Sequence, residues 1–271
     1  EIGSGLVGSE MCIRDSMNIE KLSIKQIKDL MVKECNDELL TAIKNDARKG
    51  VQSIYKSYQR EMKERQRVAN LYTFENGCRA NGYKLIAGVD EVGRGPLAGP
   101  VVVASVILPE NFFIEKINDS KKLSEATREK IYDIIMKNAI AVNRAIIDEK
   151  TIDRVNIYQA AMNGMYETIY GLNPKPDAVL IDAMPLESLD IYHQSIIKGD
   201  AKSASIAAAS IVAKVERDRM MNEFDKIYPQ YGFAKNKGYG TSEHLEALRK
   251  YGPCEIHRKS FEPIKSMVMQ K

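Results

Sequence analysis

The sequence predicts an α/β domain, a mixed β-sheet flanked by helices, that follows a helical N-terminal extension. Two observations support this fold class. Residues 17 to about 80 place apolar side chains at helical spacing among many charged ones. From Tyr83 onward, β-branched apolar runs first follow one another and later alternate with helical patterns, which is typical of a mixed sheet covered by helices.

The extension begins with a helix-start signal. Ser23 is followed by Gln26 three positions later, which is the spacing of a capping box, and apolar residues then recur at helical spacing. A second helical segment is expected to end at Gly50, because glycine commonly stops helices. A long, strongly charged helix with a basic surface is expected over residues 51–75.

Two turn signals, Asn76-Gly77 and Asn81-Gly82, separate the extension from the rest of the chain. We therefore expect a helical extension at 17–80 and a larger domain at 81–271. Residues 1–16 have no usable periodicity and resemble translated sequencing-adapter sequence, so we expect a non-native leader there.

Five strands and four helices are expected in the larger domain. The strands are expected at 84–90, 101–108, 140–147, 178–182 and 190–197. The helices are expected at about 124–138, 156–171, 203–224 and 242–251.

The composition excludes several classes of protein. The chain has 271 residues, of which 44% are hydrophobic and 28% charged, as in ordinary globular domains. No apolar run reaches membrane-spanning length and no signal-peptide pattern appears, so we expect a cytoplasmic protein without a membrane partner. The scattered cysteines and histidines argue against zinc sites and a disulfide framework, and without a heptad seam we expect a monomer. The net charge of +3 is mildly basic, so any nucleic-acid surface must be local.

Four acidic residues stand at predicted strand ends. Asp90 and Glu91 close the first strand, Asp182 closes the fourth, and Asp200 follows the fifth. Strand ends are where sites gather in sheets with helices on their faces. Convergent carboxylates repel one another unless divalent cations neutralise them, and oxygen ligands favour Mg²⁺ or Mn²⁺. The alternative is a set of solvated acids that cap turns.

The glycine-rich turn after the first strand limits how Asp90 and Glu91 can lie. Neighbouring residues of a regular strand point to opposite faces, so these two converge only if the chain turns or bulges there, as Gly93 and Gly95 would allow. The turn also matches a dinucleotide-binding fingerprint, which requires a helix to follow. A β-branched run follows instead, at 101–108, and argues against a nicotinamide-dependent oxidoreductase.

Four motifs in this order resemble type 2 ribonuclease H, ribonuclease HII. They are GVDEVGRGPLAGP at 88–100, AVLID at 178–182, IKGD at 197–200 running into SASIAAASIVAK at 203–214, and KGYGT at 237–241. The resemblance spans about residues 83–262 and implies a ribonuclease H-like mixed β-sheet flanked by helices. It also implies an endonuclease that hydrolyses the RNA strand of RNA–DNA hybrids and nicks 5′ to ribonucleotides embedded in duplex DNA. Two-metal-ion hydrolysis with Mn²⁺ or Mg²⁺ would leave 5′-phosphate and 3′-hydroxyl ends.

The resemblance also implies roles for individual residues. It assigns Asp90, Glu91, Asp182 and Asp200 to the catalytic metal-binding cluster. It assigns the turn Gly93-Arg94-Gly95 to the ribonucleotide 2′-hydroxyl, and Tyr239 to the RNA–DNA junction.

Basic and hydroxyl side chains near these motifs are further candidates for phosphate contacts. Lys121 and Lys122 precede a predicted helix, and phosphate contacts position a nucleic acid without reading its sequence. Ser203, at the start of another predicted helix, either caps that helix or contacts phosphate through backbone N–H.

Two alternatives remain open beside ribonuclease HII. Ribonuclease HIII is the nearest, but its family has a larger, sheet-containing N-terminal domain that the helical segment 17–80 does not suit. The second is a catalytically idle module that binds hybrids, against which the intact acidic set argues.

Overall fold

The computed structural model describes residues 19–269, so the predicted leader at 1–16 lies outside the described residues. The chain divides into two compact units, residues 1–64 and residues 65–271. Helix α3 (Lys49–Leu71) runs across this division.

The first unit is helical, as predicted. It contains the 3-10 helix η1 (Ile19–Lys21), α1 (Ile24–Lys33), α2 (Asp37–Asn45) and the first turns of α3. The capping box before α1 is confirmed, because the Gln26 backbone N–H donates to Ser23 Oγ at 3.3 Å and the Ser23 N–H donates to Gln26 Oε1 at 2.9 Å. A small apolar core holds the helices together, and its fully buried members are Ile27, Leu39, Ile43 and Val51.

Two predicted helix breaks in the extension are wrong. Gly50 lies inside α3, where a Cβ would come within 2.2 Å of the Ile24 side chain, so this glycine serves close packing. Asn76-Gly77 lies inside α4 (Thr73–Ala80), whose inner face buries Glu75 and Cys78. Tertiary burial outweighs the local turn preference there. The turn at Asn81-Gly82 is confirmed, with Gly82 at φ +92°.

A five-stranded mixed sheet forms the centre of the second unit. Its strands are β1 (Ile86–Val92), β2 (Val101–Ile107), β3 (Ala141–Ile147), β4 (Ala178–Asp182) and β5 (Tyr192–Ile196), in the order β3-β2-β1-β4-β5. The pairs β1–β2 and β2–β3 are antiparallel, whereas β1–β4 and β4–β5 are parallel. All five strands fall where the sequence predicts them.

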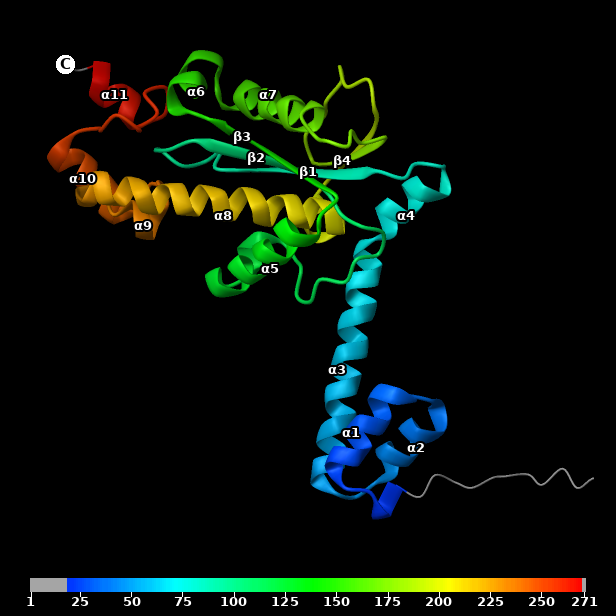
Figure 1. The fold of residues 1–271 in the computed structure, drawn as a ribbon. Helices are drawn as coiled ribbons and strands as arrows, with labels where there is room; N and C mark the ends of the chain where they lie inside the picture. Colours follow the sequence, from blue (N-terminus) through cyan, green and yellow to red (C-terminus); the bar gives the residue numbers. More distant parts are fainter. Residues whose placement is uncertain (1–18, 270–271) are drawn as a thin grey trace, which may run out of the picture. The chain divides into compact units, whose positions relative to one another are not determined.

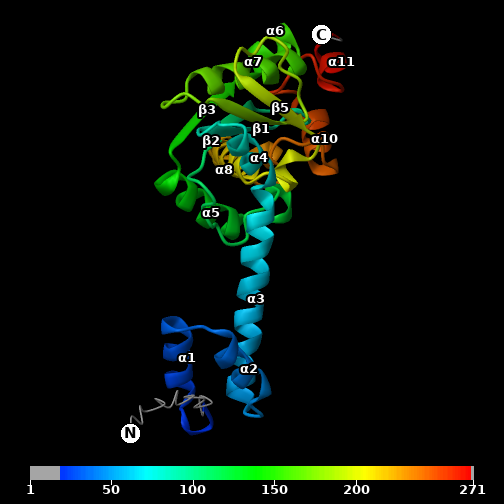
Figure 2. The same cartoon turned by 90° about the vertical axis from the view of Figure 1, so that its right-hand side faces the viewer.

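Helices cover both faces of this sheet (Figures 1 and 2). α5 (Glu125–Asn138) and α8 (Ala204–Ile227) lie on one face, and α6 (Glu149–Val155) and α7 (Ile157–Tyr170) lie on the other. Helix α6 was not predicted. The remaining elements are η2 (Ser120–Lys122), η3 (Gly199–Ala201), η4 (Pro229–Tyr231), α9 (Phe233–Asn236), α10 (Ser242–Tyr251) and α11 (Ile264–Met269). No helix within residues 19–269 is both long and apolar enough to cross a membrane.

The small residues of α8 bring this helix close to the middle of the sheet. A Cβ on Gly88 of β1 would lie 2.0 Å from the Ser205 carbonyl carbon, so no other residue fits there without moving the helix. Gly88 and Asp90 are two residues apart on one strand and therefore face the same side. The packing thus places Asp90 beside the first turns of α8.

Candidate active site

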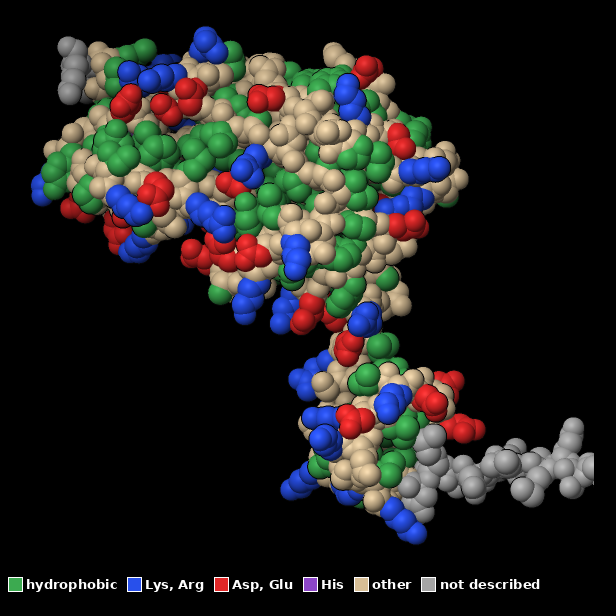
Figure 3. All heavy atoms as spheres, viewed as in Figure 1, with side chains coloured by type: hydrophobic (Ala, Val, Ile, Leu, Met, Phe, Trp, Pro, Cys, Tyr) green, Lys and Arg blue, Asp and Glu red, His purple; other side chains and the backbone are tan. Residues whose placement is uncertain are grey.

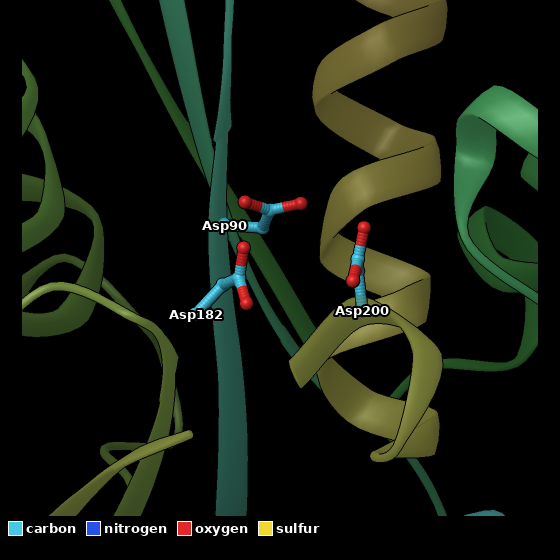
Figure 4. Close-up of side chains that lie close together, drawn as sticks. All are labelled: Asp90, Asp182 and Asp200. Carbon is cyan, nitrogen blue, oxygen red and sulfur yellow. The ribbon is translucent and has the colours of Figure 1, made fainter. Parts of the chain in front are cut away.

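The structure brings three of the four predicted carboxylates together. Asp90, Asp182 and Asp200 each offer an oxygen atom, and these atoms lie within 4.8 Å of one another (Figure 4). Asp90 and Asp182 meet because β1 and β4 are parallel neighbours, with Val89 opposite Ile181. Asp200 reaches the same space from η3, after the chain turns through Lys198 in a left-handed conformation at φ +58°.

Glu91 does not belong to this group of three but lies near it, because its charge raises the pKa of Asp90 and the charge of Asp182 raises the pKa of Glu91. The expected turn or bulge at Asp90 and Glu91 is wrong, because β1 stays regular and pairs Asp90 with Ala104 and Glu91 with Val103. Neighbouring side chains of a regular strand start on opposite faces, yet the Glu91 carboxylate still lies close enough to Asp182 for the charge of Asp182 to raise its pKa. Glu91 Oε1 accepts a hydrogen bond from Arg94 Nη1 at 3.3 Å, and Glu91 Oε2 is buried with no partner among the described residues.

The acidic residues carry electrostatic strain. Burial raises the pKa of Asp90 well above its usual range, and the charges of Glu91 and Asp182 raise it further, while Ser210 on α8 opposes them by hydrogen bonding. Burial also raises the pKa of Glu91, against the opposing charge of Arg94. Binding of protons or cations is favourable for buried carboxylates with raised pKa values, because it neutralises charges that repel one another.

Asp119 is a fifth carboxylate near the site, marked in the sequence only by its place in the loop before two lysines. The pKa of Asp200 is raised first by burial and next by the charge of Asp119, and the nearby Lys121 ammonium opposes both. Lys121 Nζ lies 3.9 Å from Asp200 Oδ2, yet its side chain is largely exposed. Asp119 also caps η2 by accepting the Lys121 backbone N–H at 2.9 Å.

These residues fit a hard divalent cation. The donor set consists of carboxylate oxygens, the ligands that Mg²⁺ and Mn²⁺ prefer. Lys121 beside the group is exposed and leaves the buried charge of Asp90 uncompensated. The orphaned Glu91 Oε2 is a further buried oxygen beside the group that lacks a partner in the part of the chain described.

The predicted Gly93-Arg94-Gly95 turn directly follows β1. Gly93 adopts φ +103°, a conformation that favours glycine, and a Cβ there would lie 2.3 Å from Arg217 Nε. The Arg94 side chain is 45% exposed and free to meet a ligand beyond its contact with Glu91. The segment after this turn is β2, which excludes the dinucleotide-binding alternative because that motif requires a helix.

Tyr239 lies beside the same turn. Its Cε1 atom would be 3.6 Å from a Cβ placed on Gly95, and the residue is 45% exposed. The two loops are also joined through their backbones, because the Leu97 N–H donates to the Gly238 carbonyl oxygen at 2.8 Å. The structure therefore brings together the turn and the tyrosine, which the sequence separates by more than a hundred residues.

The remaining predicted contacts divide into exposed and buried residues. Lys121 and Lys122 are exposed. Ser203 is fully buried, and its hydroxyl donates to Glu75 Oε1 at 2.7 Å while it accepts the Ile206 N–H at 3.2 Å. Of the two roles considered for Ser203, the structure shows the helix cap, and the backbone N–H that a phosphate would have to contact donates instead to the Gly199 carbonyl oxygen at 2.8 Å.

Glu75 is a buried residue that sequence reasoning missed. Its Oε1 atom accepts the Ser203 hydroxyl and, at 2.8 Å, the Ser205 backbone N–H, so a carboxylate from α4 satisfies the start of α8. The Ser203 N–H in turn donates to the Gly199 carbonyl oxygen at 2.8 Å, and the Gly199 N–H donates to Asp182 Oδ1 at 2.6 Å. This chain of bonds leads from α4 to the acidic group.

Comparison with known families decides the identity of the chain. The family model of ribonuclease HII matches residues 87–264, and that of the ribonuclease HII N-terminal domain matches residues 23–79. The chain belongs to the ribonuclease HII family. The ribonuclease HII of Bacillus subtilis (strain 168) is 51% identical over 251 residues, which cover 90% of this chain and 98% of that relative. The match to the N-terminal domain favours ribonuclease HII over ribonuclease HIII.

Solved structures share the fold. Ribonuclease H2 from Pyrococcus horikoshii OT3 has a TM-score of 0.60 and 25% identity, and the match covers 69% of this chain and 98% of that chain. Bst-RNase HIII in complex with Mn²⁺ has a TM-score of 0.50 and 18% identity, covering 69% of this chain and 70% of that chain, and this likeness shows the fold alone.

Membership of the ribonuclease HII family confirms the predicted enzyme class. The chain is a metal-dependent ribonuclease H, an endonuclease that acts on the RNA of RNA–DNA hybrids, and its substrate is therefore nucleic acid.

Proposed function

We propose that this chain nicks duplex DNA on the 5′ side of an embedded ribonucleotide, in addition to cutting RNA–DNA hybrids. The observation that carries the proposal is the contact between the Gly93-Arg94-Gly95 turn and Tyr239, next to the acidic group at the end of β1. A turn that binds a 2′-hydroxyl beside a ring that stacks on the next sugar would recognise one junction and not a long RNA tract.

The turn suits recognition of a 2′-hydroxyl because its backbone is held in place. Leu97 and Gly238 are joined by a backbone hydrogen bond, and Gly93 requires a left-handed conformation. A held backbone and the exposed Arg94 guanidinium offer donors at fixed positions to a sugar and a neighbouring phosphate. The half-exposed Tyr239 ring offers a face for the deoxyribose that follows.

We propose that Asp90, Asp182 and Asp200, with Glu91 beside them, hold the divalent cations, either Mn²⁺ or Mg²⁺. When bound, two such ions would lower the pKa of the attacking water and stabilise the charge on the leaving oxygen. Hydrolysis of this kind would leave 5′-phosphate and 3′-hydroxyl ends. The protein's own part is to hold the carboxylates convergent, through Ser210 and the Gly199 N–H. The exposed Lys121 and Lys122 would contact the phosphates that flank the cut.

We propose that the helical extension increases the affinity for the nucleic-acid substrate and takes no part in the cleavage reaction. One side of α3 carries a line of basic residues that border two shallow surface hollows, namely Lys49, Lys56, Arg60 and Lys63. These residues recur at helical spacing and so form one basic stripe, which suits phosphate contacts. On the face of the second unit seen in Figure 3, acidic and basic side chains are interspersed, and this face shows no continuous basic stripe. We also propose that the protein acts in the cytoplasm as a monomer.

A gel assay on matched duplexes tests the proposal. The duplexes contain a single ribonucleotide, several consecutive ribonucleotides or none, and each is incubated with Mg²⁺, with Mn²⁺ or with a chelator. We expect a metal-dependent nick 5′ to the single ribonucleotide. Loss of the Tyr239 ring removes about 1–3 kcal/mol of stacking, so Tyr239→Ala should impair this nick far more than Tyr239→Phe.

Two results would contradict the proposal. Cleavage restricted to consecutive ribonucleotides would exclude nicking at single sites, and an unimpaired Tyr239→Ala variant would exclude junction recognition by this ring. Binding of hybrids without cleavage of any duplex, under every metal condition, would favour the catalytically idle alternative.

A further inference from the structure

A buried pair of histidines lies next to the Tyr239 loop, outside the carboxylate group. His244 is in the first turn of α10, and His257 follows α10 in the C-terminal segment. Both side chains are almost fully buried, with exposures of 0% and 1%. Their Nε2 atoms lie 3.0 Å apart, so one of the two must carry a proton that the other accepts.

The surrounding groups determine which nitrogen carries each proton. The Cys254 backbone N–H points at His257 Nδ1 from 2.9 Å, so this Nδ1 must be the acceptor. The Cys254 thiol, 3.1 Å away, can only add a second donor, since burial raises the pKa of this thiol to about 11. At the other end, His244 Nδ1 lies 2.9 Å from the Tyr239 carbonyl oxygen, which can only accept, so His244 Nδ1 must carry a proton.

These two assignments leave one arrangement for the neutral pair. His257 carries its proton on Nε2 and donates it to His244 Nε2, and His244 donates its Nδ1 proton to Tyr239. The hydrogen bonds thus run in one direction, from Cys254 through both rings to the Tyr239 carbonyl oxygen. Burial lowers the pKa of His244 and, with the neighbouring His244, lowers that of His257 to about 4, in agreement with neutral rings.

We propose that His244 and His257 are positioning residues that hold the Tyr239 loop in the conformation used to recognise the RNA–DNA junction. This inference rests on the proposed role of Tyr239. The Tyr239 carbonyl oxygen accepts two hydrogen bonds, from His244 and, at 2.8 Å, from the Thr241 N–H, and the Tyr239 N–H donates to the Asn236 carbonyl oxygen at 2.9 Å.

The bond from His244 to Tyr239 spans only five residues, but the other side of the His244 ring lies against His257, so the pair links this loop to the C-terminal segment. The bonds to Thr241 and Asn236 make no such link and would move together with the loop. The rings of Tyr231 and Phe233 surround the histidines, with centroids 4.9 and 5.7 Å from that of His257. In such an apolar setting a hydrogen bond is stronger than in water and an unpaired partner is costly, so the chain of bonds is expected to restrict the Tyr239 backbone.

Variants of His244 separate positioning from general packing. His244→Asn keeps a side-chain donor near the place of Nδ1, whereas His244→Leu keeps apolar volume and removes the donor. We expect His244→Leu to lower single-ribonucleotide cleavage relative to cleavage of consecutive ribonucleotides by about threefold to tenfold, the equivalent of one hydrogen bond. His244→Asn should restore most of this ratio. His193→Asn, on β5, serves as the control and should not change it.

The decisive experiment combines this variant with Tyr239→Ala. If His244 acts through Tyr239, the double variant should show the same cleavage ratio as Tyr239→Ala alone, because the effects of coupled residues do not add. An undiminished effect of His244→Leu in the Tyr239→Ala background would overturn the proposal, and so would a wild-type ratio in His244→Leu.

A spectroscopic test distinguishes failure of this inference from failure of the proposed function. Long-range proton–nitrogen NMR spectra of the nitrogen-15-labelled full chain near neutral pH should show His244 protonated on Nδ1 and His257 on Nε2. The opposite tautomers, or charged rings, would contradict the chain of hydrogen bonds from Cys254 to Tyr239, even if Tyr239 proves essential. Wild-type cleavage by Tyr239→Ala would overturn junction recognition itself, and the positioning role with it, even if the tautomers are as assigned.

Discussion

Arg217 and Arg258 approach the same glycine-rich turn from two different segments, and both are fully buried. Arg217, on α8, donates to the carbonyl oxygens of residues 98, 100 and 237. Arg258 donates to those of residues 93, 94 and 99. Within the described residues, every hydrogen bond of these two side chains goes to a carbonyl oxygen. Two buried guanidinium groups therefore hold the turn and the Tyr239 loop in one arrangement.

Replacement of Arg258 by lysine should destabilise the protein and weaken recognition of the single ribonucleotide. Lysine lacks the planar fork that reaches several carbonyl oxygens at once, and each buried acceptor left unpaired costs about 1–3 kcal/mol. Thermal unfolding and KM on the single-ribonucleotide duplex measure the two effects. The matched control is Arg219→Lys, at a partly exposed pair with Glu129, which should cost at most about 1 kcal/mol. Equal stability of the two variants would contradict the role of Arg258.

Removal of one charge from the acidic group should abolish most cleavage without unfolding the domain. The variants are Asp90→Asn, Glu91→Gln and Asp182→Asn. Each weakens cation binding while it relieves the repulsion that raises the pKa of Asp90. The melting temperature in metal-free buffer should therefore hold or rise, whereas the stabilisation that added Mn²⁺ produces should shrink. Near-wild-type cleavage by any of the three variants would exclude that residue from the metal site.

Protein stability should fall as the pH drops from about 6.5 to about 4, in part because of His257. Its pKa is near 4 in the folded protein and near 6.5 when unfolded, so in this window the unfolded chain binds the extra proton. The full shift corresponds to roughly 3 kcal/mol. The raised pKa values of Asp90, Glu91 and Asp200 act in the opposite direction.

Comparison of the wild type with His257→Gln isolates this contribution, because the carboxylates and the neighbouring His244 and Cys254 are common to both proteins. Urea unfolding measured across the window should show a shallower loss of stability in the variant. Parallel pH profiles would mean that His257 is not neutral and buried as the structure has it.

Deletion of the first compact unit should weaken substrate binding and leave the chemistry intact. A chain that begins at residue 65 loses the basic stripe of α3 but keeps Glu75, which caps α8. Substrate affinity should fall and its salt dependence should flatten, because fewer phosphates are neutralised. Deletion to residue 80 removes Glu75 as well and should also lower thermal stability. A lower rate at saturating substrate with unchanged affinity, in the shorter deletion, would contradict this division of roles.

Local patterns were sufficient for much of the fold. The five strands and the capping box at Ser23 follow from residue types at short spacing, which act over a few residues in any context. The errors arose where distant contacts override such preferences. Asn76-Gly77 stays helical because α4 buries one face, and Gly50 packs against Ile24 inside α3.

For the site, the sequence by itself determined which acidic residues stand at strand ends, and the parallel pairing of β1 and β4 then brings Asp90 and Asp182 together. The rest depends on how the chain packs: β1 remains regular at Asp90 and Glu91, and Glu75 and Arg217 meet partners more than a hundred residues away, whereas the buried contact between the two histidines joins segments only 13 residues apart. A hydrogen-bond donor or acceptor that is buried away from water must bond to another group of the protein, and this bond fixes the position of both groups. Which polar residues are buried depends on how the whole chain packs, so a local sequence pattern cannot predict it.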